Sequence, residues 1–303
     1  MSATTLRTLS PIDGSVVVER SLHTTGHIDQ TLARAVLSQR KWALTPLEER
    51  RRRVSGLIDC LVSRRAQLAE EITRQMGRPV SQSPGEIRGL EERARSMIEQ
   101  APAALKDHLP APKSGFKRFI RRVPLGVVAV IAPWNYPYLT SVNAVIPALV
   151  AGNAVVLKHS HQTPLCAERY AEAAEEAGLP ADLLQYLHLD HPGVAALLSD
   201  SRIAHATFTG SVAGGVSVTR ALLGRFVGPT LELGGKDPAF VRSDTDLAYA
   251  VENLVDGAFF NSGQSCCGIE RIYVHRALFK DFVDRFVALT RQYCLGNPCL
   301  LYT

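Results

Sequence analysis

The stretch from Pro124 to Lys158 reads PLGVVAVIAPWNYPYLTSVNAVIPALVAGNAVVLK, and no charged side chain occurs before its last residue. A membrane span is one reading of such a run. Prolines at 133, 137 and 147 interrupt it, however, and asparagines at 135, 143 and 153 would need hydrogen-bond partners in lipid. The pattern is more typical of a buried strand over 127–132, a loop, a helix and a second strand ending at 155–158.

The same alternation continues on the C-terminal side of this stretch. Thr163-Pro164 opens a helix that ends at Gly178 and Pro180, and residues 205–208 form another short apolar strand. Strands that alternate with helices indicate parallel βαβ units. The carboxyl ends of such strands share one edge, where ligands bind, so we expect a ligand edge near positions 133, 158 and 209.

The regions outside this core carry patterns of other kinds. The first hundred residues are predicted to be helical, with helices over 46–63, 65–76 and 86–100, and Thr45-Pro46-Leu47-Glu48 has the layout of a capping box. Residues 116–122 alternate bulky and basic side chains, which is typical of an exposed strand or hairpin arm. Helical spacing recurs over 247–258 and 277–293.

The composition excludes several classes of protein. With 46% hydrophobic and 21% charged residues, the 303-residue chain has an ordinary globular composition. Its net charge of +5 is mild, and Arg50 to Arg53 beside Glu48 and Glu49 is interpreted as a solvated helix face, so nucleic acid binding is not predicted. The N-terminus lacks an apolar core of signal-peptide length, which favours a cytoplasmic protein with reduced thiols. The six cysteines show no metal-ligand spacing.

The stretch Phe259-Phe260-Asn261-Ser262-Gly263-Gln264-Ser265-Cys266-Cys267 presents a cysteine between two glycines, Gly263 and Gly268. A thiolate at neutral pH needs a helix N-terminus, a cation or a general base close by. A cysteine taken alone is more often a buried small hydrophobe. The motifs upstream of it, PWNYP at 133–137, VVLK at 155–158, FTGS at 208–211 and ELGGKDP at 232–238, favour a nucleophile.

Each of these motifs has a chemical and a plainer interpretation. Gly210-Ser211-Val212-Ala213-Gly214-Gly215 could hold a pyrophosphate at a helix N-terminus, or could be only a tight turn. Lys158 could reach ribose hydroxyls or a phosphate, or could end a strand at the surface. Glu232 could serve as a general base if partial burial raised its pKa, or could cap a helix. The Asn135 amide could donate to an oxyanion, or could belong to a turn.

Five of these residues occur in the order Asn135, Lys158, Ser211, Glu232 and Cys266, with a separation of 23 residues from 135 to 158 and of 34 residues from 232 to 266. This arrangement resembles the aldehyde dehydrogenase superfamily, and the resemblance runs from about residue 7 to Pro298. The resemblance implies an α/β fold, in which a Rossmann-like parallel sheet forms a cofactor domain over 1–233 with an oligomerisation arm at 116–128. The start of a second α/β catalytic domain would occupy 234–303.

The resemblance also implies a reaction. Cys266 would attack an aldehyde, Asn135 and the Cys266 backbone N–H would hold the oxyanion, hydride would pass to NAD or NADP, and Glu232 would activate water to hydrolyse the thioester. Cofactor binding would fall to the motif residues Pro133, Trp134, Lys158, His161, Gly210, Ser211, Gly215, Leu233 and Gly234. Members that prefer NAD often carry glutamate where this chain has His161, so NADP or dual use is open.

Family members continue well past the cysteine, whereas this chain departs from the pattern after Gly296-Asn297-Pro298. We therefore expect a C-terminally truncated form with little turnover by itself. The alternative is a non-catalytic truncated subunit that binds nucleotide, forms a homo-oligomer or associates with a full-length subunit. Acylating chemistry with coenzyme A is a third option, which Glu232 disfavours.

Overall fold

The computed structural model describes residues 5–300 and is built around a five-stranded sheet. The strand order is β5-β4-β3-β6-β7, and every neighbouring pair is parallel. This is the order of a Rossmann-like fold, so the predicted fold class is confirmed. The strands are β3 (Val127–Ala132), β4 (Ala154–His159), β5 (Leu184–Tyr186), β6 (Ile203–Gly210) and β7 (Pro229–Leu233).

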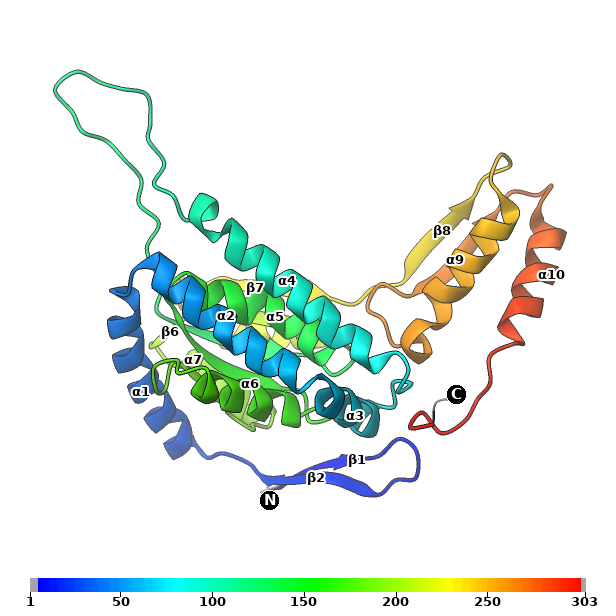
Figure 1. Cartoon of the computed structure of the whole chain (residues 1–303), viewed down its shortest axis with the longest axis horizontal. Helices are drawn as coiled ribbons and strands as arrows, with labels where there is room; N and C mark the ends of the chain where they lie inside the picture. The colour runs from blue at the N-terminus through cyan, green and yellow to red at the C-terminus, as the bar shows by residue number, and fades with distance from the viewer. Residues whose placement is uncertain (1–4, 301–303) are drawn as a thin grey trace.

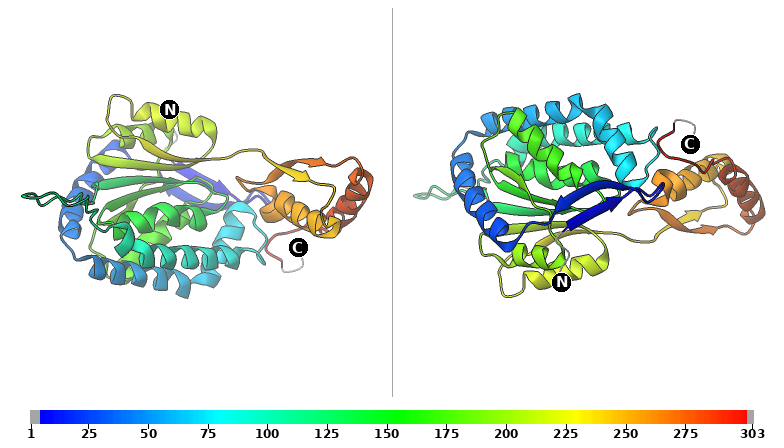
Figure 2. Two further views of the ribbon diagram at one scale, coloured as in Figure 1. Left: turned by 90° about the horizontal axis from the view of Figure 1, so that it is seen from above. Right: turned by 90° about the horizontal axis from the view of Figure 1, so that it is seen from below.

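Helices cover both faces of this sheet (Figures 1 and 2), which explains why β3 and β4 are apolar on both sides and buried along their whole lengths. One face is covered by α5 (Pro137–Val150) and α6 (Leu165–Glu176), with an outer layer of α2 (Leu47–Ser63), α3 (Arg65–Met76) and α4 (Ser83–Ala104). The other face carries α1 (Thr25–Ala43), α7 (His191–Ser199) and α8 (Val212–Ala221). The uncharged stretch thus forms the predicted strand, loop, helix and strand.

The N-terminal region differs from the prediction in three details. It begins with an antiparallel hairpin of β1 (Thr5–Leu9) and β2 (Val16–Ser21), not with helix. The predicted capping box at Thr45 is wrong, because the N-cap of α2 is Pro46, which has no side-chain acceptor, and the Thr45 hydroxyl donates back to Lys41 O. A capping box does form in this region, at the start of α1 between Thr24 and His27.

Arg50 does not belong to a solvated helix face. It is 9% exposed, and its Nε has no hydrogen-bond partner in the structure. The next three arginines of α2 form ion pairs with Glu48 and Glu49. Position 50 lies on the face of α2 that is turned to the core, as the equally buried Val54 one turn later shows.

Residues 105–126 leave the helical layer as a long projection (Figure 1). The predicted strand over 116–122 is not regular, because only two isolated bridges, His108 to Ile120 and Lys113 to Phe116, join its two limbs. Val127 and Val128, which the prediction assigned to the arm, are buried in β3. The projection carries exposed apolar side chains, namely Leu109, Phe116, Phe119, Ile120, Val123 and Leu125.

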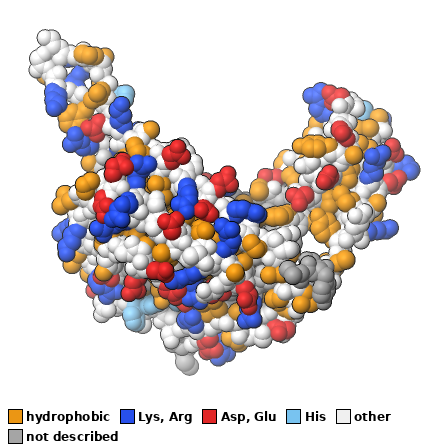
Figure 3. Space-filling model, in the orientation of Figure 1, with side chains coloured by type: hydrophobic (Ala, Val, Ile, Leu, Met, Phe, Trp, Pro, Cys, Tyr) orange, Lys and Arg blue, Asp and Glu red, His pale blue; other side chains and the backbone are white. Residues whose placement is uncertain are grey.

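After Leu233 the chain leaves the five-stranded sheet and forms a smaller unit beside it (Figure 2). Its strands β8 (Asp237–Val241) and β9 (Ile269–Val274) pair in parallel, and α9 (Leu247–Phe259) packs beside α10 (Phe279–Thr290). Hydrophobic side chains remain visible on its surface and on the projection (Figure 3). The following segment reaches back to the helical layer, where Val80 N donates to Pro298 O at 2.7 Å.

Candidate active site

The cysteine turn follows α9 and precedes β9. A single 3₁₀ turn, η1 (Phe260–Gly263), redirects the chain, and Asn261 and Ser262 in it adopt left-handed backbone angles, with φ of 54° and 57°. Asparagine tolerates this conformation better than most residues do. Cys266 then lies in a tight turn, and the Cys266 backbone carbonyl accepts a hydrogen bond from Gly235 N at 3.2 Å. The turn is thereby fastened to the segment that follows β7.

The PWNYP loop joins the end of β3 to the start of α5 and lies against the cysteine turn. The Asn135 Nδ2 donates to Gln264 O at 2.7 Å, and the Tyr136 hydroxyl lies 2.6 Å from the Ser265 Oγ. A carboxamide nitrogen carries two hydrogens, so the second Asn135 N–H is left for another acceptor. Two hydrogen bonds therefore hold the predicted oxyanion donor next to the predicted nucleophile.

A cavity of about 820 Å³ brings Cys266 and Glu232 together. Tyr136, Leu139 and Thr140 from the start of α5 form one wall, and Thr209 lies beside Glu232 in the β6–β7 register. Cys267 also lines the cavity. Asn135 does not line it and reaches the cysteine turn from the side, through Gln264.

The electrostatic surroundings do not convert the Cys266 thiol into a thiolate. Burial raises its pKa most, and the neighbouring Cys267 raises it further, whereas the backbone N–H groups of the two cysteines act weakly in the other direction. The neutral thiol therefore dominates at pH 7, and a reaction needs a proton acceptor. Glu232 is an exposed carboxylate, not a partly buried one, and it lines the same cavity.

Lys158, at the carboxyl end of β4, has the properties of a ligand-binding cation. It is 8% exposed, and within the described residues 5–300 its ammonium group has no hydrogen-bonded or ion-paired partner. Burial lowers the pKa of Lys158 to about 8, although the negative charge of Asp190 acts in the opposite direction. An unpaired buried ammonium at this edge of the sheet fits the acceptor oxygens of a nucleotide.

The turn after β6 forms a second part of this edge. Ser211 is the N-cap of α8, and its Oγ accepts from Gly214 N at 3.1 Å. The Phe208 ring stands over this turn, since a Cβ at Gly210 or Gly214 would lie 2.6 or 2.4 Å from its Cζ. The exposed start of α8 leaves N–H groups for an anion, so this edge suits a dinucleotide.

The remaining predicted cofactor residues surround the same edge in different ways. Pro133 is buried, whereas Trp134 and Leu233 are 39% and 38% exposed. Gly215 packs against the Leu233 side chain, and Gly234 has open space around it. The His161 ring nitrogen Nε2 lies 2.9 Å from Leu189 O, so this side chain is tied to the loop before α7 and does not simply face solvent.

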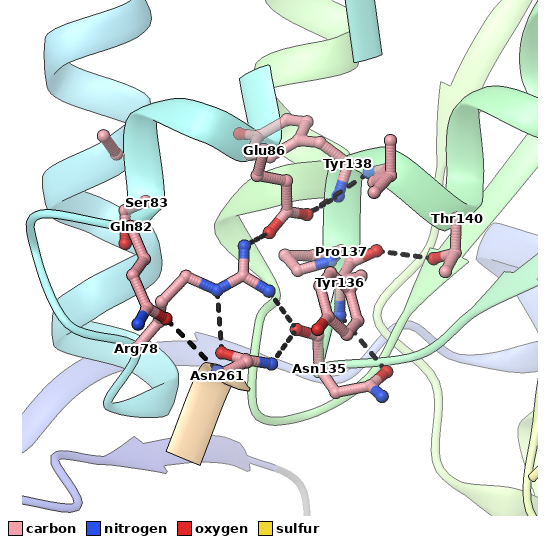
Figure 4. A network of polar contacts seen from close by, with 12 residues as sticks. Arg78, Gln82, Ser83, Glu86, Asn135, Tyr136, Pro137, Tyr138, Thr140 and Asn261 are labelled. Carbon is pink, nitrogen blue, oxygen red and sulfur yellow. Dashed lines mark hydrogen bonds and ion pairs between the residues drawn. The ribbon is translucent and has the colours of Figure 1, made fainter. Parts of the chain in front are cut away.

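Sequence reasoning missed the residues that connect these loops (Figure 4). Arg78 and Asn261 both hydrogen-bond to Asn135 O, and Arg78 also bonds to Glu86 and to the Asn261 side chain. Glu86 in turn accepts from Tyr138 N at 2.8 Å. A lone arginine between Gly77 and Pro79 carries no charge pattern, so the signal available was only its position just after an amphipathic helix.

The model of the aldehyde dehydrogenase family matches residues 1–301. The chain belongs to this family. The fold described above is therefore the family's fold.

Curated relatives and solved structures agree with this membership. The chain is 36% identical over 296 residues, 97% of its length, to "Succinate-semialdehyde dehydrogenase [NADP(+)] 1" of Mycobacterium tuberculosis (strain H37Rv) and covers 65% of that protein. It is 32% identical over 271 residues, 89% of its length, to "Succinate semialdehyde dehydrogenase [NAD(P)+] Sad" of Escherichia coli (strain K12) and covers 58% of that protein. The crystal structure of PnpE with nicotinamide adenine dinucleotide superposes with a TM-score of 0.95 at 29% identity, over 99% of this chain and 62% of that one.

The chain thus spans about three fifths of the length of these relatives. Within residues 5–300, every helix is too short or too polar to span a bilayer. No cluster of three or more His, Cys, Asp or Glu side chains in the same range is placed to hold a metal ion.

Proposed function

We propose that this aldehyde dehydrogenase chain oxidises an aldehyde to a carboxylic acid with NAD⁺ or NADP⁺, through a covalent intermediate on Cys266. The observation that carries the proposal is the shared cavity, in which Cys266 and Glu232 line one space of about 820 Å³. Both curated relatives are succinate semialdehyde dehydrogenases by name, so succinate semialdehyde is the first aldehyde to test.

Cys266 begins the reaction as a nucleophile. Its proton passes to a base as sulfur forms a bond to the carbonyl carbon, and the C=O electron pair moves onto oxygen to give a thiohemiacetal oxyanion. The free Asn135 N–H and the Cys266 backbone N–H would donate to that oxygen, and one such donor is typically worth roughly 10²–10³ in rate. The hydride of this adduct would pass to bound NAD⁺ or NADP⁺, and loss of the hydride would leave a thioester on Cys266.

Glu232 completes the reaction as a general base. Its carboxylate would take a proton from water while the water oxygen attacks the thioester carbon, and the C–S bond then breaks to release the acid and the Cys266 thiolate. Glu232 is the carboxylate among the residues that line this cavity. The proton that Cys266 loses in the first step passes to water, so Glu232 is still ionised when the thioester is hydrolysed. Hydrolysis, not transfer to coenzyme A, follows from this base.

Lys158 and the start of α8 would hold the cofactor. The unpaired ammonium of Lys158 suits ribose hydroxyls or a phosphate, and the exposed N–H groups after Ser211 suit a pyrophosphate. His161 would lie at the adenosine end, where it carries no fixed negative charge to repel a 2′-phosphate. We therefore propose that both NAD⁺ and NADP⁺ are accepted.

The test is intact-protein mass spectrometry of the 303-residue chain with succinate semialdehyde and NADP⁺ or NAD⁺. We expect a succinyl adduct that maps to Cys266, builds up further in Glu232→Gln because hydrolysis is lost, and disappears in Cys266→Ala. Cys267→Ala is the matched control and should keep the adduct. An adduct that survives in Cys266→Ala would end the assignment, and no adduct in any form would favour the non-catalytic alternative.

We further propose that the projection over 105–126, which holds most of the arm predicted at 116–128, contacts a second copy of this chain or a longer homologue. Its support is the group of exposed apolar side chains on a segment that projects away from the fold. Exposed apolar side chains raise the free energy of the chain in water, and burial against a partner lowers it.

A further inference from the structure

Arg78 occupies the point where three separate segments meet (Figure 4). Its side chain is 2% exposed. The Nε donates to the Asn261 Oδ1 at 2.8 Å, and one terminal nitrogen donates to Asn135 O at 2.7 Å. The other terminal nitrogen forms an ion pair with Glu86. The planar guanidinium thus bonds in three directions at once, which an ammonium group cannot do with the same geometry.

Glu86 fixes the helical side of this junction. Its side chain is fully buried, and its second oxygen accepts from Tyr138 N at 2.8 Å and from Leu139 N at 3.2 Å. Those two N–H groups belong to the first turn of α5, where a carboxylate is favourable because the helix leaves them unpaired. Arg78 and Glu86 therefore set where α5 begins, directly after the PWNYP loop.

Asn261 fixes the side of the cysteine turn. It is completely buried, and its Nδ2 donates to the same Asn135 carbonyl at 3.0 Å. Its own carbonyl accepts from Gln264 N and from Gln264 Nε2, both at 3.1 Å. Gln264 is also the residue whose carbonyl receives the Asn135 amide. A closed ring of hydrogen bonds thus connects Arg78, Asn261, Gln264 and Asn135.

Tyr136 adds a further contact. The Arg78 guanidinium carbon lies 4.4 Å from the centre of its ring, and the Tyr136 hydroxyl is bonded to Ser265, which immediately precedes the nucleophile. Of the groups that Arg78 contacts, the Asn135 carbonyl and the Tyr136 ring belong to the PWNYP loop, and Asn261 belongs to the cysteine turn. An arginine that only stabilised the helical layer would need none of these three contacts.

We propose that Arg78 is a positioning residue, which holds the Asn135 amide and the Cys266 turn in register from behind the site. It does not line the cavity that Cys266 and Glu232 share. The inference rests on the proposed function for its effect on chemistry, because the register matters only if Cys266 and Asn135 act on the same carbonyl. The connection between the two loops is a property of the folded chain alone and can be measured without any reaction.

The decisive variant is Arg78→Lys, which keeps a cation beside Glu86 but cannot keep both loop contacts. We expect faster amide hydrogen exchange at 133–137 and at 260–266 together, with exchange in α2 and β4 unchanged. Succinylation of Cys266 should slow about 100-fold at saturating aldehyde, because a displacement near 1 Å can cost that much. The aldehyde concentration that gives half the maximal rate should stay the same.

Asn261→Gly is a second variant, in case Arg78→Lys does not fold. Glycine accepts the left-handed backbone at this position and removes only the side chain, so the Arg78–Glu86 pair survives. Arg169→Lys is the matched control, because Arg169 is a partly buried arginine that forms ion pairs with Glu71 and Glu172 and bonds to neither loop. It should leave exchange at 133–137 and 260–266 unchanged.

Unchanged exchange in both loops of Arg78→Lys and of Asn261→Gly would overturn the inference. So would a slower succinylation that appears equally in Arg169→Lys. If the wild-type chain forms no adduct, the proposed function fails, while the exchange data still decide whether Arg78 connects the loops.

Discussion

Lys158 allows the electrostatics of a single residue to be tested through stability. In the folded chain its pKa is about 8, below the ordinary lysine value, and burial is the main cause. Between pH 8 and the unfolded value near 10.5 the unfolded chain binds more protons, so stability should rise with pH across this window. Below pH 8 the full cost of a buried cation remains, about 3 kcal/mol from a shift of this size.

We therefore expect Lys158→Met to be more stable than the wild type at pH 7, by up to about 3 kcal/mol, and to lose this advantage by about pH 10. Urea unfolding at a series of pH values measures it. Lys41→Met, at an exposed position on α1, is the control and should show no such pH-dependent difference. An advantage for Lys158→Met that is the same at pH 7 and pH 10 would contradict the buried-charge explanation.

Single residues also show how far the sequence could go. Cys266, Glu232, Asn135 and Lys158 could be named from residue type and spacing, because the chemistry demands those types. The raised pKa of Cys266 could not be predicted, since it depends on burial and on Cys267 in the folded turn. The burial of Arg50 and of Arg78 was missed for a related reason, because it depends on which parts of the folded chain pack against each side chain.

The projection over 105–126 is the element whose role is most directly testable. If its apolar side chains bind a partner copy, replacing Phe116, Phe119 and Ile120 by serine should lower the mass seen by light scattering to that of one chain. Leu223→Ser with Phe226→Ser is the control, because those apolar side chains are even more exposed but lie in the turn after α8. A wild-type chain that is monomeric both alone and in a mixture with a longer homologue would refute the docking role.

Elements were predictable where one pattern dominates. The apolar runs of β3 and β4 indicate buried strands. Prolines and glycines beside α5 and α6 mark where these two helices begin and end. The hairpin of β1 and β2 was missed because polar Thr8 is buried while Leu9 is exposed, so the apolar residues of β1 do not follow the alternation of a strand. The cap at Thr45 failed because its hydroxyl has a competing acceptor in the preceding helix.

At the scale of the whole molecule, the two units differ in the size of their cores. The core around the five-stranded sheet combines residues of α1 to α8 with the sheet strands. Within residues 5–300, the buried side chains at the centre of the smaller unit's core are Val241, Val251, Val255 and Phe282. The free energy from apolar burial grows with the area buried, so the smaller unit should open first. We expect exchange in α9, α10, β8 and β9 to reach its limit at lower urea than exchange in β3 and β4.

Phe282→Ala should separate the two units further. It removes the largest side chain of the small core, a change that typically costs about 3–5 kcal/mol, and its effect should be confined to residues 237–290. Leu57→Ala, in the large core, should instead accelerate exchange in the five-stranded sheet. Hydrogen exchange at increasing urea distinguishes the two. If Phe282→Ala lowered the protection of β3 as much as that of α10, the chain would unfold as one cooperative unit and the cysteine turn would share the stability of the sheet.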